Sequence, residues 1–137
     1  MAHYFKNEAE TLLVVDDKKA TRRLEARALR QLGYKVLEAE GPVEAMRLAA
    51  VTQSIHLLLT DFWMPQGNGL ELARRFRTLH PKTPVLMVSG SLETIDDLSG
   101  YLDRFGILAK PYTSTDLAHG VRTLLRGAIS HHALAFP

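Results

Sequence analysis

The segment LLVVDDKK, residues 12–19, places two adjacent carboxylates, Asp16 and Asp17, directly after four apolar residues. Such an apolar run is typical of a strand that is buried on both faces, as in a parallel sheet covered by helices. The neighbouring acids repel each other at the end of that strand. The segment therefore predicts a buried parallel strand that ends at a site rich in negative charge.

Working outward from this segment, strand-length apolar runs alternate with stretches that have helical spacing. The expected strands are residues 12–15, 35–39, 55–60, 84–88 and 107–109. The expected helices are residues 20–32, a helix that starts at Pro42, residues 70–79, a segment within 92–102, and residues 115–125. This alternation predicts an α/β fold with a doubly wound parallel sheet.

Helical spacing also predicts which side chains face the core. In the first helix we expect Leu24, Ala28 and Leu32 to be buried, and Gly33 to end the helix as its C′ residue. We expect Ser114 to cap the last helix. The other predicted inward positions are Val43, Met46, Ala50, Leu72, Phe76, Leu79, Leu117, Val121 and Leu124.

Composition excludes several classes of protein. The 137 residues leave room for one domain with a single core. With 46% hydrophobic residues and no apolar run near the roughly 20 residues of a spanning helix, we expect a soluble protein with no membrane partner. The N-terminus resembles no secretory signal, and the chain has no cysteine, so we expect a cytoplasmic location. A net charge of +2 without a basic patch interleaved with aromatics predicts no direct nucleic-acid binding.

Polar residues gather at the carboxyl ends of the predicted strands, where doubly wound sheets bind their ligands. Asp61 follows the third strand, Ser89 the fourth and Lys110 the fifth, in addition to Asp16 and Asp17 after the first. Crowded carboxylates suit a hard divalent cation such as Mg²⁺. Three carboxylates, an ammonium group and a hydroxyl are the parts needed to transfer a phosphoryl group to an aspartate.

Four stretches, LLVVDDKKATR, LLLTDFWMPQGNGLEL, PVLMVSG and ILAKPY, resemble the receiver domain of two-component response regulators, the CheY-like family. The resemblance covers about residues 11–126, with residues 1–10 as an N-terminal extension and 127–137 as a C-terminal tail. It implies a flavodoxin-like (βα)5 three-layer sandwich, with a parallel five-stranded sheet in the order 2-1-3-4-5.

The resemblance also implies roles for individual residues. Asp61 matches the phosphoacceptor, and Asp61 and Asp17 match the two carboxylates that bind Mg²⁺ directly, while Asp16 is expected to act through metal-bound water. The backbone carbonyl of Trp63 is expected to be the third protein ligand. Trp63 lies two residues after the acceptor and Ser91 two residues after Ser89, and neither supplies a carboxylate or amide to orient the attacking water, so we expect slow autodephosphorylation. The alternative is that Trp63 contacts a partner.

On the other side of the site, Ser89 matches the switch hydroxyl and Lys110 the lysine of the family, and the Lys110–Pro111 peptide bond is expected to be cis. One departure concerns the switch: the chain has Ile107 where the family often has an aromatic residue. Phe105 and Tyr112 are nearby but out of register, and we interpret both as ordinary core or surface aromatics. The resemblance thus predicts a switch that lacks the usual aromatic.

The resulting hypothesis is a signalling domain, not an enzyme. It accepts a phosphoryl group on Asp61 from a histidine kinase or histidine phosphotransfer protein and changes its surface for a downstream effector protein. The fourth helix, fifth strand and fifth helix form the expected docking face, through which a homodimer is also conceivable.

Two alternatives remain open. The chain can be a receiver domain excised from a hybrid sensor histidine kinase, which passes the phosphoryl group onward. A Mg²⁺-dependent phosphohydrolase with an aspartyl nucleophile belongs to another class; the DxDxT signature expected for it is missing, because Phe62 and Trp63 follow Asp61.

Overall fold

Five parallel strands form one sheet in the order β2-β1-β3-β4-β5 in the computed structural model, which describes residues 9–90 and 105–127. The strands are β1 (Thr11–Val15), β2 (Lys35–Ala39), β3 (Leu57–Asp61), β4 (Val85–Ser89) and β5 (Phe105–Ala109). The helices are α1 (Lys19–Gln31), α2 (Pro42–Val51), α3 (Gly69–Leu79) and α5 (Ser114–Leu125). The α/β fold and the strand order are confirmed. The helix expected within residues 92–102 lies outside the described residues.

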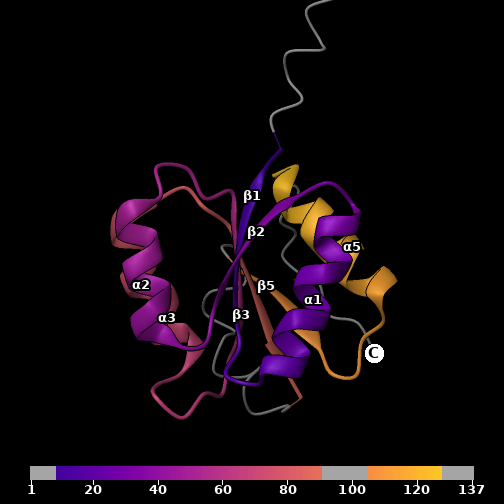
Figure 1. Ribbon diagram of the computed structural model, residues 1–137, viewed down its shortest axis with the longest axis horizontal. Helices are drawn as coiled ribbons and strands as arrows, with labels where there is room; N and C mark the ends of the chain where they lie inside the picture. Colours follow the sequence, from indigo (N-terminus) through magenta and orange to yellow (C-terminus); the bar gives the residue numbers. More distant parts are fainter. Residues whose placement is uncertain (1–8, 91–104, 128–137) are drawn as a thin grey trace, which may run out of the picture.

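Helices cover both faces of the sheet, which gives the expected three layers. α1 and α5 lie on one face and α2 and α3 on the other, with the sheet seen edge-on between them (Figure 1). Every residue of β3 and β4 is buried. This explains the continuous apolar runs in the sequence, since neither face of these strands meets water.

Four of the five strands differ from the predicted bounds by one or two residues, and ladder pairing explains two of these differences. β3 ends at Asp61, which pairs with Val88 and is itself buried. β5 begins at Phe105, which pairs with Val85 and is 2% exposed. The phosphoacceptor candidate therefore belongs to the sheet and not to a loop beyond it.

The predicted inner face of α1 is wrong. Leu24 is 70% exposed and Leu32 is 48% exposed, whereas Glu25, Ala26 and Leu29 are buried. Two overlapping stripes satisfy helical spacing in this segment. Hydropathy favours the more apolar stripe, because the other stripe includes a carboxyl group that hydropathy assigns to the surface. In the structure that other stripe is the one that is buried.

The other helices agree with the predicted faces to different degrees. In α5 all three expected residues are buried: Leu117, Val121 and Leu124. In α3, Leu72 and Phe76 are buried but Leu79 is half exposed. In α2 the predicted face is shifted, since Val43 and Ala50 are exposed while two alanines are buried instead: Ala45 and Ala49.

Helix ends fix the connections near the sheet edge. Gly33 follows α1 with φ +101 and donates its N–H to the carbonyl of Arg30, while Tyr34 donates to Leu29. This is the Schellman arrangement, and it confirms Gly33 as the C′ residue. At α5 the cap is Thr113, not Ser114: Thr113 Oγ1 accepts from the N–H of Asp116, whose carboxylate accepts from the N–H of Thr113. Among the described residues, no helix has both the length and the apolar character to cross a membrane.

Candidate functional site

Hydrogen bonds to β2 and α1 hold Asp16 in place. Its N–H continues the β1–β2 ladder by donating to the carbonyl of Ala39 (3.1 Å). Its carbonyl accepts from Nη1 of Arg22 in α1 (2.9 Å), and its Oδ1 accepts from the N–H of Lys18 (2.9 Å). Asp16 is only 3% exposed. The carboxylate is therefore positioned by backbone hydrogen bonds before any ligand is considered.

Three carboxylates meet at the carboxyl end of the sheet. One oxygen from each of Asp16, Asp17 and Asp61 lies within 4.8 Å of the other two. Asp16 and Asp61 are buried, and Asp17 is the more exposed of the three. Buried carboxylates repel one another unless a cation lies among them, and oxygen ligands suit a hard divalent ion. The cluster thus has the donor set of a metal-binding site.

Lys110 pairs with the central acid. Its Nζ lies 3.1 Å from Oδ1 of Asp61. Burial raises the pKa of the Asp61 carboxyl, the hydrogen bond and charge of Lys110 oppose that rise, and the carboxylates of Asp16 and Asp17 add to it. Asp61 is therefore a carboxylate with little water around it, whose negative charge is partly balanced by one ammonium group.

The far side of the site is built by β4 and β5. The N–H of Lys110 donates to the carbonyl of Ser89 (2.9 Å), which continues the pairing of these strands beyond Ala109. Ser89 is 2% exposed and follows Val88, the residue paired with Asp61. The Lys110–Pro111 peptide bond is cis, as expected. The structure thus brings the hydroxyl, the ammonium group and the acceptor onto three adjacent strands.

The β3–α3 loop returns closely against the acceptor. Gly69 donates its N–H to the carbonyl of Phe62 (2.7 Å). A Cβ at Gly69 would lie 2.6 Å from the carbonyl oxygen of Asp61 and 2.6 Å from Sδ of Met87. Asn68 caps α3, since its Oδ1 accepts from the N–H of Glu71 (2.8 Å). Only glycine leaves space for the helix to begin directly behind Asp61.

Trp63 lies at the outer side of this loop. Its side chain is 58% exposed and meets the ring of buried Phe62 edge to face, with centroids 4.9 Å apart. The expected role of its carbonyl as a metal ligand stays a prediction. Ser91, the other residue on which the prediction of slow autodephosphorylation rests, lies outside the described residues.

Ile107 and Phe105 both face the core. They are 1% and 2% exposed and pair with Met87 and Val85 of β4. Phe105 is therefore a core aromatic, as interpreted from the sequence. Tyr112 differs from that interpretation, because it makes a specific polar contact.

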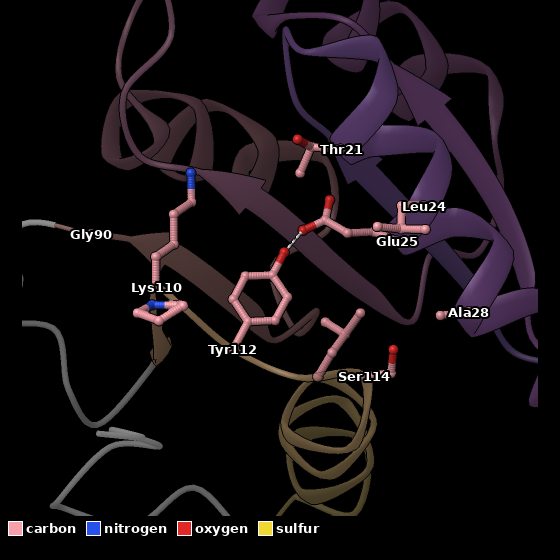
Figure 2. Close-up of a pocket in the computed structure, with 10 residues that line it drawn as sticks. Thr21, Leu24, Glu25, Ala28, Gly90, Lys110, Tyr112 and Ser114 are labelled. Atoms are coloured by element: carbon pink, nitrogen blue, oxygen red, sulfur yellow. Dashed lines mark hydrogen bonds between the residues drawn. The ribbon is translucent and has the colours of Figure 1, made fainter.

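Sequence reasoning missed that contact, which is a hydrogen bond from the hydroxyl of Tyr112 to Oε2 of Glu25 (Figure 2). Glu25 is 6% exposed and lies in α1. One signal was available: Glu25 is the single acid in a helix that contains Lys19 and four arginines. A lone acid on the buried side of a basic helix needs a partner.

Comparison with known proteins identifies the same family as the four sequence stretches. Residues 12–122 match the family model of the response regulator receiver domain. The chain is 36% identical over 120 residues to a chemotaxis protein CheY homolog of Campylobacter jejuni, covering 83% of this chain and 91% of that protein. It is 34% identical over 115 residues to the autoinducer 1 sensor kinase/phosphatase LuxN of Vibrio campbellii, covering 82% of this chain but only 13% of LuxN.

Among solved structures, the receiver domain of the hybrid histidine kinase CckA superposes with a TM-score of 0.71 at 34% identity, covering 84% of this chain and 98% of that domain. The family match spans most of the chain, and the site residues occupy the strand ends where the four sequence stretches placed them. The chain belongs to the response regulator receiver domain family.

Proposed function

We propose that this receiver domain accepts a phosphoryl group on Asp61 in a Mg²⁺-dependent reaction and changes its partner-binding surface in response. The observation that carries the proposal is the cluster of three carboxylates with Nζ of Lys110 at 3.1 Å from Oδ1 of Asp61. Burial of Asp61 raises its pKa and leaves its carboxylate poorly solvated, which favours nucleophilic attack once the charge is balanced.

The reaction is a displacement at phosphorus. An oxygen of the Asp61 carboxylate forms a new bond to the phosphorus of the donor, and the bond from phosphorus to the leaving group breaks with its electron pair on that group. With an acyl phosphate donor the leaving group is a carboxylate, so the charge balances without a proton. With a phosphohistidine of a kinase or phosphotransfer protein, the leaving group is the imidazole.

The remaining residues balance charge around the transferred group. Asp16, Asp17 and the carbonyl of Trp63 would hold Mg²⁺, which when bound supplies positive charge to the phosphoryl oxygens. Lys110 contributes its ammonium group from the other side, and the hydroxyl of Ser89 donates a hydrogen bond. Ladder hydrogen bonds hold the backbones of Asp16, Ser89 and Lys110, so this part of the site is assembled before the donor arrives.

Phosphorylation adds negative charge at the end of β3, beside the strands that carry Ser89 and Lys110. The signal then passes as a shift between two packings of the neighbouring loops and helices. The partners of this cycle are a histidine kinase or histidine phosphotransfer protein as donor and an effector protein as reader. We expect the domain to work in the cytoplasm.

Incubation of the chain with acetyl phosphate and Mg²⁺, followed by intact-mass measurement, tests the proposal. One phosphoryl group should add, and Asp61→Asn should abolish labelling. Asp116→Asn is the matched control, since the Asp116 carboxylate belongs to the capping box of α5 and not to the carboxylate cluster, and this variant should label as the wild type does. Full labelling of Asp61→Asn would overturn the assignment, and turnover of small phosphate esters that is lost in Asp61→Ala would favour the phosphohydrolase instead.

A second candidate is favoured by the similarity to LuxN and to the CckA receiver domain. As part of a hybrid sensor kinase, the domain would return its phosphoryl group to a histidine phosphotransfer protein. The phosphorylated domain should then lose its label when such a protein is added, and that protein should gain it. Retention of the label would favour a stand-alone regulator.

A further inference from the structure

Glu25 and Tyr112 link α1 to the loop that carries Lys110. Tyr112 lies two residues after Lys110, between β5 and α5, and its hydroxyl donates to Oε2 of Glu25. The two side chains point toward each other from opposite sides of a cavity of about 630 Å³ (Figure 2). Lys110 lines the same cavity, with Thr21 and Leu117. The hydrogen bond therefore ties the position of the lysine to a buried side chain of α1.

Glu25 contacts a neutral hydroxyl, so burial has the largest effect on the pKa of the Glu25 carboxyl. Burial raises the pKa of Glu25 from 4.5 to about 7, the hydrogen bond from Tyr112 lowers it, and the carboxylates of Asp16 and Asp61 raise it. The ammonium group of Lys110 lowers it. These groups lie at the ends of β1, β3 and β5, so the ionisation of Glu25 responds to three charged groups of the phosphoacceptor site.

Resting on the proposed function, we propose that Glu25 and Tyr112 are positioning residues for Lys110, and that the neutral carboxyl of Glu25 favours phosphoryl transfer to Asp61 whereas its carboxylate opposes it. Transfer replaces the single negative charge of Asp61 with the larger charge of an acyl phosphate. A carboxylate at Glu25 repels that added charge and attracts Lys110 away from Asp61. Phosphorylation should accordingly favour protonation of Glu25, because such coupling is reciprocal.

The coupling can be measured without any phosphoryl donor. In the full chain, carbon-13 NMR of the Glu25 carboxyl should show a titration near pH 7, well above the ordinary 4.5. Asp61→Asn removes one nearby negative charge and should shift that titration to lower pH. A Glu25 titration at the ordinary value, or one that Asp61→Asn leaves in place, would overturn the proposal while leaving Asp61 as the phosphoacceptor untouched.

The consequence for transfer is a pH profile of the labelling rate with acetyl phosphate and Mg²⁺. The wild-type rate should fall about fivefold as pH rises through the titration of Glu25 measured in the same buffer, a size typical of coupled sites. Glu25→Gln keeps a neutral acceptor for Tyr112 and should remove this fall. Tyr112→Phe removes the hydrogen bond that lowers the pKa of Glu25, so the fall in the labelling rate of this variant should occur at higher pH.

Matched controls are Glu71→Gln, an exposed acid of α3, and Tyr34→Phe, a partly buried tyrosine that packs beside α1. Both should keep the wild-type profile. The proposal fails if wild type and Glu25→Gln have the same profile across this range. Absence of labelling in the wild type at every pH would instead refute the proposed function, and the NMR titration would still report on the charge coupling.

Discussion

At the scale of single residues, the site is a set of ionisable groups with little water between them. Asp16 and Asp61 are both buried, and Lys110 balances part of the charge of Asp61. Glu25, in α1, lines the same cavity as Lys110. Sequence alone located the first three, because parallel strands bring their carboxyl ends to one edge. It could not locate Glu25, whose function depends on which face of a helix packs on the sheet.

The buried carboxyl of Glu25 should make stability depend on pH. Its pKa is 4.5 when exposed and about 7 in the folded protein, so between these values the unfolded chain ionises first and stability falls as pH rises. The full cost, reached above pH 7, is roughly 3 kcal/mol. Urea unfolding of Glu25→Gln should therefore show a gain over the wild type that grows through this window.

Glu71→Gln serves as the control for that experiment, since Glu71 is exposed and should follow the wild type at each pH. A constant difference between Glu25→Gln and the wild type would mean that Glu25 ionises normally in the folded chain.

Substitution of Trp63 tests whether its exposed aromatic side chain shields an acyl phosphate on Asp61 from water. Its ring stands edge to face against Phe62 and is 58% exposed, two residues after Asp61. Trp63→Asn introduces an amide that can orient water, and Trp63→Ala removes the shield, so both should speed loss of the phosphoryl group. Mass spectrometry of the decaying label measures this. Unchanged decay in both variants would identify Trp63 as a partner contact.

At the scale of elements, agreement between sequence and structure depends on how each element is buried. Strands buried on both faces are recognised from composition alone, and β3 and β4 appear where expected. Amphipathic helices are harder, because two apolar stripes can coexist. In α1, Leu24 and Leu32 face outward, while Ala26 and Leu29 are buried together with Glu25.

The junction of β3 and α3 gives a prediction at this scale. Gly69→Ala would place a Cβ 2.6 Å from the carbonyl oxygen of Asp61, which is backbone and cannot rotate away. We expect a loss of about 1–3 kcal/mol of stability and slower labelling, because the strand must shift. Gly90→Ala is the control, since its Cβ would lie 3.5 Å from Cβ of Lys110 and should cost little. Equal unfolding midpoints for the two variants would contradict the close packing.

At the scale of the whole molecule, the fold is predictable to a large extent because its topology follows from simple rules. Alternating strands and helices require crossovers, and helices on both faces require fully apolar strands. The region between β4 and β5 is a different case, because the helix expected at residues 92–102 had mixed spacing interrupted by Gly100 and lies outside the described residues.

On the proposed function, Mg²⁺ should stabilise the molecule as a whole, because the carboxylate cluster that would hold it is assembled only in the folded chain. At a hundredfold excess over its Kd the gain is about 3 kcal/mol. Scanning calorimetry should show a higher Tm, and Asp17→Asn should reduce that rise more than Asp16→Asn. NaCl of equal ionic strength controls for screening. The reverse order of the two variants would exchange their assigned roles.

The ladder hydrogen bonds that extend beyond the strands have a consequence for exchange kinetics. The amides of Asp16, Phe62 and Lys110 donate to the carbonyls of the neighbouring strands at 3.1, 2.9 and 2.9 Å. Their deuterium uptake should therefore be as slow as that of the central sheet and should follow global unfolding. In that case the backbone frame of the site has no separate local opening, and it lasts as long as the folded molecule does.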